Sequence, residues 1–186
     1  FFIASAHTSV LFFTNKGQVH WLKVYEIPEG GRQAKGKPIV NLLRLQEKEY
    51  VNSFVPVRSF EAGKFLFMAT RRGVVKKIDV TTFSNPRNGG IRALTLDEGD
   101  ELVGVEMTDG TRQIMLATRQ GMAIRFSEQD VRAMGRGATG VWGITLDEKD
   151  EVVALEVVDE NTTLLTVTSK GYGKRTAVVD YRLIAR

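Results

Sequence analysis

The sequence predicts an all-β fold made of repeated four-stranded units, arranged in the manner of a propeller. Three observations predict it: short runs of β-forming residues, a Thr-x-x-Gly turn that recurs along the chain, and an acidic segment that returns after 50 residues. A period near 50 residues is typical of stacked supersecondary units. We therefore expect one domain spanning residues 1–186, because no Pro/Ser-rich linker divides the chain.

The recurring turn marks each repeat with a glycine. Its copies TNKG, TRRG, TRQG and TSKG end at Gly17, Gly73, Gly121 and Gly171, which lie 56, 48 and 50 residues apart. Such a turn fits a tight hairpin whose glycine adopts the left-handed conformation. The chain would then hold three full repeats and part of a fourth.

The strands of a repeat are short apolar runs between turn residues. The acidic segment LTLDEGDELV at 94–103 returns as ITLDEKDEVV at 144–153, and residues 43–51 form a looser first copy. Residues 127–134 could add one helical turn. Residues 1–6 have the composition of a strand cut at its edge, which would make the chain a fragment. Strands are expected at 102–107, 113–118, 122–126 and 141–146.

Composition excludes several classes of protein. The chain has 42% hydrophobic and 26% charged residues and no cysteine, so thiol catalysis and disulfide frameworks are excluded. No apolar run reaches membrane-spanning length, and no signal peptide opens the chain. The net charge of +4 and the pI of about 9.4 are modest, so the placement of the charges matters more than their sum.

Cations recur at matching places in the repeats. The fourth residue after each turn glycine is Trp21, Lys77, Arg125 and Arg175, and the third is His20, Lys76, Ile124 and Lys174. The turns carry further cations, and Arg/Gly-rich loops at 30–37, 86–92 and 132–137 precede the next strands. The candidate DNA-binding residues are Lys16, Arg32, Lys35, Lys37, Arg71, Arg72, Lys76, Lys77, Arg87, Arg92, Arg125, Arg132, Arg136, Lys174 and Arg175.

A repeat with cations at fixed positions predicts a basic stripe along one edge of the assembly. Duplex DNA is a line of phosphates, and glycines among Arg and Lys allow the backbone to approach it closely. The alternative is that these cations protect exposed strand edges from aggregation. Recurrence in all four copies favours phosphate binding. Because strand residues alternate between faces, only one of Lys76 and Lys77 should face the phosphates, and the repeat register favours Lys77.

No catalytic or metal site is predicted. Residues 31–37 match the start of a phosphate-binding P-loop, but Pro38 replaces the magnesium-binding hydroxyl, and strand-like residues 38–43 follow instead of a helix. The acidic segments lack calcium-loop spacing and are interpreted as solvated turns. The two histidines, His7 and His20, are too few for a His-rich site. Most aromatic residues, such as Phe12 and Phe67, are expected in the core rather than stacked on bases.

The sequence resembles the C-terminal domain of bacterial DNA gyrase A. The resemblance is carried by residues 13–25 (FTNKGQVHWLKVY), 36–43 (GKPIVNLL), 131–135 (VRAMG) and 171–177 (GYGKRTA). It implies a β-pinwheel, a propeller-like disc of about six blades that exchange strands, of which about four are present. It also implies that duplex DNA bends around a basic rim, so that the holoenzyme introduces negative supercoils with ATP.

The resemblance also limits the role of this chain. The hallmark Gln-Arg-Arg-Gly-Gly-Lys/Arg-Gly box is absent, which truncation would explain. The DNA-cleaving tyrosine, ATP and Mg²⁺ would act in other parts of the enzyme, so Tyr25, Tyr50, Tyr172 and Tyr181 inherit no catalytic role and the fragment needs no cofactor. The implied partners are duplex DNA, the rest of gyrase A, and gyrase B, in the bacterial cytoplasm near the nucleoid. The alternatives are the matching domain of topoisomerase IV and a propeller that serves as a protein-interaction scaffold.

Overall fold

The computed structural model describes residues 2–186. The secondary structure in this range consists of β-strands and short 3-10 helices. Its helices are single 3-10 turns of three or four residues, as expected for the region around 127–134. The strands are β1 (Ser9–Thr14), β2 (Gln18–Lys23), β3 (Val51–Val57), β4 (Phe65–Thr70), β5 (Val74–Asp79), β6 (Ile91–Arg92), β7 (Leu102–Thr108), β8 (Gln113–Thr118), β9 (Ala123–Ser127), β10 (Val141–Trp142), β11 (Val152–Val158), β12 (Thr163–Val167) and β13 (Gly173–Ala177). The 3-10 helices are η1 (Val24–Glu26), η2 (Ile39–Asn41), η3 (Val80–Phe83), η4 (Glu128–Asp130) and η5 (Val178–Asp180).

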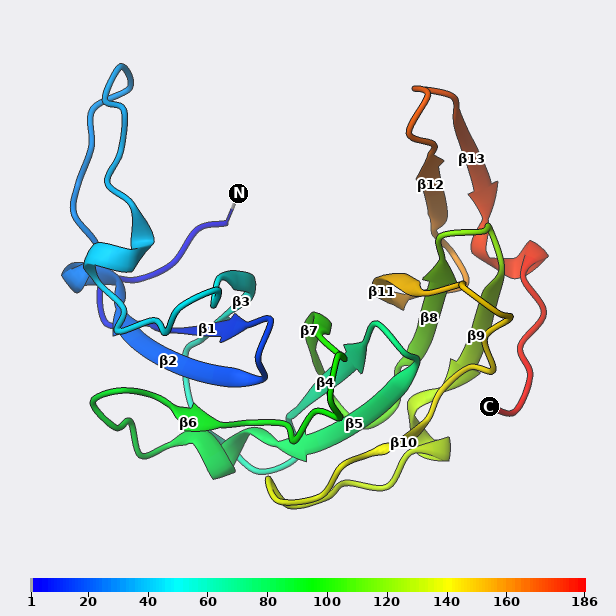
Figure 1. The fold of residues 1–186 in the computed structure, drawn as a ribbon, viewed down its shortest axis with the longest axis horizontal. Helices are drawn as coiled ribbons and strands as arrows, with labels where there is room; N and C mark the ends of the chain where they lie inside the picture. The colour runs from blue at the N-terminus through cyan, green and yellow to red at the C-terminus, as the bar shows by residue number, and fades with distance from the viewer. Residues whose placement is uncertain (1) are drawn as a thin grey trace.

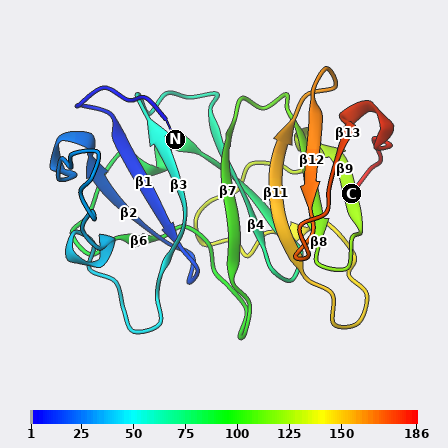
Figure 2. The same ribbon diagram turned by 90° about the horizontal axis from the view of Figure 1, so that it is seen from above.

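The strands form four antiparallel sheets, one per repeat. Their orders are β3-β1-β2-β6, β7-β4-β5-β10, β11-β8-β9 and β12-β13. The sheets follow one another around an open arc, with β3, β7 and β11 on its concave side and β6 and β10 on its convex side (Figures 1 and 2). We call each sheet a blade and number the blades 1 to 4 along the chain.

Each blade is built around the recurring hairpin. The glycine N–H donates to the threonine carbonyl at 2.9–3.1 Å in all four turns. The threonine hydroxyl also accepts from the N–H four residues on, as in the 3.2 Å bond from Val74 to Thr70. Gly17, Gly73, Gly121 and Gly171 all have φ between 71° and 91°, which confirms the expected left-handed turn.

Strand exchange between repeats completes the blades. β6 comes from the second repeat but pairs with β2 of the first, and β10 comes from the third repeat but pairs with β5 of the second. The inner strands are not exchanged, since β3 pairs with β1 of its own repeat and β7 pairs with β4 of its own repeat. The fold is therefore an all-β pinwheel of propeller-like blades, as the sequence predicts.

The core lies between adjacent blades. One cluster joins blades 1 and 2 and includes Phe13, Leu66 and Phe83. A second joins blades 2 and 3 and includes Phe67 and Phe126. Strand β4 is consequently buried on both faces, and β1 is buried on its other face by a third cluster within its own repeat, which includes Val10, Phe12 and Leu43. Both strands therefore have nearly continuous apolar sequences rather than a simple alternation.

Three expected strands differ in the structure. Residues 2–6 form no strand, and residue 1 of that expected strand lies outside the described part. Residues 39–41 form η2, because the corresponding segments of later repeats become strands only by pairing with the hairpin of the preceding repeat. Of the expected strand at 141–146, only Val141–Trp142 forms a strand, β10. The next residue, Gly143, lies so close to the Val75 side chain that a Cβ on it would be 2.6 Å away. In residues 2–186, no helix is long and apolar enough to cross a membrane.

Candidate nucleic-acid interface

Two Arg/Gly loops lie along the convex edge of the arc. The first basic loop, residues 86–92, leads into and includes β6, and the second basic loop, residues 132–138, precedes β10 (Figure 1). Arg87, Arg92 and Arg132 are exposed, and Arg136 is half-buried. Because both loops lie beside the exchanged outer strands of consecutive blades, strand exchange itself presents these arginines at repeated intervals.

The cations at the fourth position after the turn glycine are inside the molecule instead. Lys77 is buried, and its Nζ donates to the carbonyl of Glu128 at 2.8 Å and lies 3.8 Å from Glu128 Oε2. The Glu128 carboxylate is itself fully buried and accepts hydrogen bonds from Thr108 Oγ1 and Arg112 N. Lys77 also lies 5.3 Å from the centre of the Phe65 ring. The expected preference for Lys77 as the phosphate contact therefore does not fit its burial.

Arg125 is buried in the same way between blades 3 and 4. Its Nη1 donates to the carbonyls of Val178 and Tyr181, each at 2.8 Å, and its Nε donates to Gln113. Its Nη2 pairs with Glu160. Trp21 occupies the equivalent position in blade 1 and donates from Nε1 to the Phe83 carbonyl at 2.9 Å. In blades 1 to 3 this position links the hairpin to the 3-10 helix of the next repeat, so a stripe of phosphate-facing cations does not form there.

Lys76 is fully buried as well. Its Nζ donates to the carbonyls of Ala93, Arg136 and Ala138 at 3.2, 2.7 and 2.7 Å. Burial, together with the nearby charge of Arg136, lowers the pKa of Lys76 to about 8. The interior position follows from the exchange of β10, which brings the second basic loop across β5.

The turn cations lie beside the acidic segments. The guanidinium of Arg71 is 3.6 Å from Glu101 and 3.8 Å from Glu151, and Lys16 donates to the carbonyl of Glu47. Arg72 is exposed, although its main-chain N–H is bonded to Asp100. Neighbouring carboxylates thus partly compensate the charge of Arg71 at the tip of blade 2.

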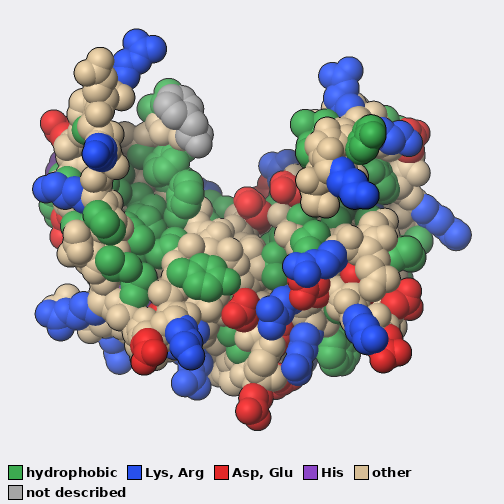
Figure 3. Space-filling model, turned by 45° about the horizontal axis from the view of Figure 1, so that its top comes forward, with side chains coloured by type: hydrophobic (Ala, Val, Ile, Leu, Met, Phe, Trp, Pro, Cys, Tyr) green, Lys and Arg blue, Asp and Glu red, His purple; other side chains and the backbone are tan. Residues whose placement is uncertain are grey.

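The remaining predicted cations lie at the two ends of the arc. Arg32, Lys35 and Lys37 are exposed on the long segment that projects at the upper left of Figure 1, and Lys174 and Arg175 are exposed on β13 at the upper right. Figure 3 shows Lys and Arg side chains at both ends and over the lower rim, with acidic side chains among them. The structure therefore separates the predicted set into a convex edge, hairpin tips, arc ends and buried inter-blade positions.

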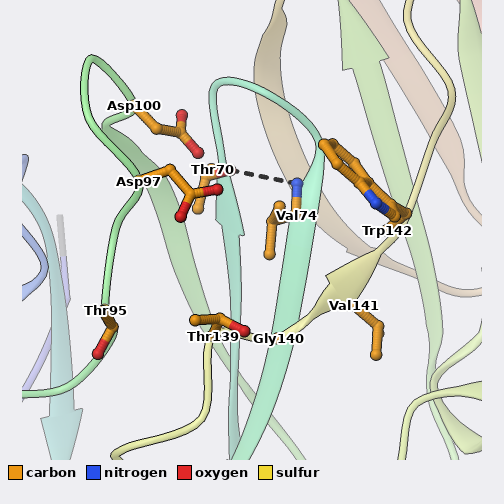
Figure 4. Close-up of a pocket in the computed structure, with 9 residues that line it drawn as sticks. All are labelled: Thr70, Val74, Thr95, Asp97, Asp100, Thr139, Gly140, Val141 and Trp142. Atoms are coloured by element: carbon orange, nitrogen blue, oxygen red, sulfur yellow. Dashed lines mark hydrogen bonds between the residues drawn. The ribbon is translucent and has the colours of Figure 1, made fainter.

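The described residues provide no cluster of metal-ligating side chains. Residues 2–186 contain no group of three or more His, Asp or Glu side chains that could hold a metal ion. One small pocket, of about 160 Å³, lies between the hairpin tip of blade 2 and the turn after β6. Thr70, Asp97, Asp100 and Trp142 surround it, and it contains no acid/base pair bonded to a nucleophile (Figure 4).

Comparison with known proteins identifies the family. Residues 8–58, 64–109, 112–159 and 162–186 match the family described as "DNA gyrase C-terminal domain, beta-propeller". The chain belongs to this family. Each matched segment contains one of the four turn glycines, so the gyrase C-terminal domain repeats coincide with the repeats read from the sequence.

Curated relatives agree with this membership. The DNA gyrase A protein of Halalkalibacterium halodurans is 51% identical over 142 residues, and that of Haemophilus influenzae is 52% identical over 141 residues. Each alignment covers 76% of this chain but only 17% and 16% of the relative. The chain thus spans about a sixth of the length of these relatives.

Solved structures share the fold of this gyrase-family domain. The C-terminal domain of DNA topoisomerase IV superimposes with a TM-score of 0.88 at 27% identity, covering 97% of this chain and 57% of that one. The DNA gyrase A C-terminal domain gives 0.83 at 26% identity, covering 98% and 59%.

The sequence did not reveal the roles of several residues that hold the hairpins and outer strands of this gyrase-family domain in place. Asp100 and Asp150 each accept main-chain N–H bonds from the neighbouring hairpin tip, at Arg72 and Gln120. Their recurrence after 50 residues was the signal that could have identified this role. Trp142 is 64% exposed on the outer strand, at the place equivalent to Arg92, so it is not a core residue. Glu128 has no such signal, because the equivalent residues are Val80 and Val178.

Proposed function

We propose that this domain binds duplex DNA without catalysing a reaction and bends the DNA along the convex edge of its blades. The observation that carries the proposal is the repeated display of arginines from the two basic loops on successive outer strands. Phosphates recur regularly along a duplex, and arginines that neutralise them release condensed counterions. Such contacts read the backbone and deformability of DNA rather than base edges.

The proposed phosphate contacts differ in rank. Arg87, Arg92, Arg132 and Arg136 come first, because they lie on the convex edge. The cations of the arc ends could extend the path in both directions: Arg32, Lys35, Lys37, Lys174 and Arg175. The hairpin-tip cations come last: Arg71 is paired with Glu101 and Glu151, Lys16 donates to the main-chain carbonyl of Glu47, and Arg72 lies beside the acidic turn.

Within a complete enzyme, the domain would support ATP-dependent negative supercoiling by DNA gyrase. Its partners would be the rest of gyrase A, and gyrase B, which would supply the cleaving tyrosine, ATP and Mg²⁺. We place this activity in the bacterial cytoplasm at the nucleoid. The family membership and the gyrase A relatives support this proposal.

A second candidate is the corresponding domain of DNA topoisomerase IV. The higher TM-score of that structure favours it, whereas the roughly twofold higher identity of the curated gyrase relatives favours gyrase. Grafting this chain onto a gyrase A protein that lacks its own C-terminal domain would separate the two. Restored ATP-dependent supercoiling of relaxed plasmid supports the gyrase assignment, and relaxation alone contradicts it.

The binding proposal is tested by ligating nicked circular plasmid in the presence of the protein and measuring the linking number. We expect salt-sensitive binding and a shift in linking number that grows with protein concentration. Binding without a shift would limit the domain to plain DNA attachment. Absence of DNA binding, together with salt-insensitive binding to another protein, would favour the protein-interaction scaffold instead.

A further inference from the structure

The buried ammonium of Lys76 contacts two separate parts of the convex edge. It lies on β5 and is 0% exposed. An ammonium group has three N–H donors, and here three main-chain carbonyls lie within 2.7–3.2 Å of it. The group is therefore fully used by the protein and has no donor left for a phosphate.

The three carbonyls belong to the segments that carry the candidate arginines. Ala93 directly follows the first basic loop and Arg92. Arg136 and Ala138 belong to the second basic loop. A single side chain thus connects the residue after the first basic loop to the second half of the second basic loop, across the boundary between blades 1 and 2.

The second half of the second basic loop, residues 135–138, has few other anchors. Gly135 and Gly137 have open space where a Cβ would lie, so no neighbouring atom holds them by packing. Glycine loses more conformational freedom on ordering than other residues, so this loop needs specific contacts to stay in one place. The first half of the loop is anchored independently of Lys76, by the parallel bridge between Ala133 and Lys77, by the 2.8 Å bond from Met134 N to Lys77 O and by packing of Met134 against the core. In the second half, residues 135–138, the main-chain bond beside those to Lys76 is the internal one from Ala138 N to Gly135 O.

We propose that Lys76 is a positioning residue that fixes the spacing of the two basic loops, so that Arg92 and Arg136 meet a phosphate path in register. The proposal rests on the proposed DNA-binding function. Charge-assisted hydrogen bonds are stronger than neutral ones. Two of them hold the second half of the second basic loop, and the third fixes Ala93, directly after the first basic loop. Affinity for a stiff, regular duplex depends on such preorganisation.

The chain contains a matched control for Lys76. Lys174 occupies the same position after the turn glycine in blade 4, but its side chain is exposed on β13. Lys76→Met and Lys174→Met therefore remove the same charge from equivalent strand positions. Only the first change removes a contact to the basic loops.

The spacing of the loops can be measured directly, because the chain has no cysteine. Spin labels at Asn88→Cys, in the first basic loop, and at Thr139→Cys, directly after the second, are both on exposed residues and report the spacing of the loops by pulsed electron paramagnetic resonance. We expect a narrow distance distribution in the parent, a broadened one after Lys76→Met, and no change after Lys174→Met. An unchanged distribution in a folded Lys76→Met variant overturns the proposal.

DNA binding separates positioning from direct contact. Lys76→Met should weaken binding and reduce the linking-number shift, and both losses should follow the broadened label distribution. A direct phosphate contact would instead lower the salt slope by about 0.9 with the label distribution unchanged, which would overturn positioning. Lys76→Arg keeps the charge but replaces three rotatable donors by a planar fork, so it should also broaden the distribution.

The two proposals fail in different ways. If the parent binds no DNA, the proposed function is wrong, whereas the label distances still test the structural role of Lys76. Folding is monitored by the β-sheet circular dichroism of each variant. If Lys76→Met and Lys76→Arg both unfold the domain, Lys76 is required for the whole fold rather than for the loops, and the proposal is overturned.

Discussion

Lys77 donates a 2.8 Å hydrogen bond from its ammonium to the main-chain oxygen of Glu128, which belongs to the next repeat. Trp21 and Arg125 make the equivalent bonds to Phe83 and to Val178. Three chemically different side chains therefore serve one purpose, which is to hold a hairpin against the 3-10 helix that follows it. The recurrence of cations at this strand position reflects the docking of blades.

Replacing Lys77 by methionine should destabilise the domain strongly. The change leaves the fully buried Glu128 carboxylate without its cation, and breaking a buried ion pair costs about 3–5 kcal/mol. Urea unfolding followed by tryptophan fluorescence measures the loss. In the folded variant, the salt slope of DNA binding should equal that of the parent, and a slope reduced by about 0.9 would restore Lys77 as a phosphate contact.

A double substitution tests how much of the loss belongs to the pair. Lys77→Met combined with Glu128→Gln removes both charges, so it should be less destabilised than the sum of the two single changes. Additive losses would show that the main-chain bond from Lys77, rather than the ion pair, carries the stability.

The repeat architecture could be predicted from the sequence because its determinants are local. Gly17, Gly73 and the threonines that precede them specify the same turn wherever they occur, and apolar runs specify strands. The prediction of a strand at 38–43 was wrong because strand formation there depends on a partner from another repeat and not on local sequence. Its sequence resembles β6 and β10, but an outer strand forms only where the preceding repeat offers β2 or β5 as a partner.

The candidate site was predictable only in part. The Arg/Gly loops are on the surface as expected, since glycine-rich polar segments cannot be buried easily. Lys76, Lys77 and Arg125 could not be placed, because a sequence does not show which main-chain carbonyls strand exchange will bring to a cation. Buried lysine and arginine are rare without such partners, so surface placement is the ordinary expectation.

Removing arginines from the convex edge should weaken DNA binding without affecting stability. Arg87→Ala/Arg132→Ala removes two exposed cations, one from each basic loop. We expect the salt slope to fall by up to about 2 and affinity to fall similarly for unrelated sequences. The free energy of unfolding should stay within about 0.5 kcal/mol of the parent. A loss confined to one DNA sequence would point to base readout instead.

Lys64→Ala and Lys149→Ala provide controls of equal charge away from the basic loops. If these changes lower the slope as much as Arg87→Ala/Arg132→Ala, the binding depends on net charge and no defined path along the convex edge exists. Filter binding of one duplex at several salt concentrations distinguishes the two outcomes.

Acidification should destabilise the domain through His20. Burial lowers the pKa of His20, although the Glu49 carboxylate, 3.9 Å away, opposes the shift. His20 Nε2 has no hydrogen-bond partner among residues 2–186. Just below the unfolded pKa of about 6.5, the unfolded state therefore binds a proton more readily than the folded state. Stability is fully present above this pH and falls as the pH is lowered toward the folded pKa.

The measurement is the thermal midpoint of the parent and of His20→Gln at pH 7.5 and at pH 5. Glutamine does not titrate, so His20→Gln should lose less stability between these pH values than the parent does. An equal loss in both proteins would assign the acid sensitivity to other groups.

The imidazole ring of His20 is also close to the first basic loop, since a Cβ on Gly90 would lie 2.8 Å from His20.

The turn glycines should differ in their tolerance of alanine, although their conformations are alike. Gly17 has φ of 71° and Gly171 has φ of 85°, so alanine at either position adopts an unfavourable left-handed conformation at a cost of about 1–2 kcal/mol. At Gly17 the added Cβ would also lie 2.6 Å from the Leu94 carbonyl oxygen, whereas at Gly171 nothing lies within 4 Å. Gly17→Ala should therefore be clearly more destabilising than Gly171→Ala in urea unfolding. The excess measures the close approach of the exchanged segment after β6 to the hairpin of blade 1. Equal losses would mean that this segment separates from the turn in solution, so that the first basic loop is not held at the convex edge.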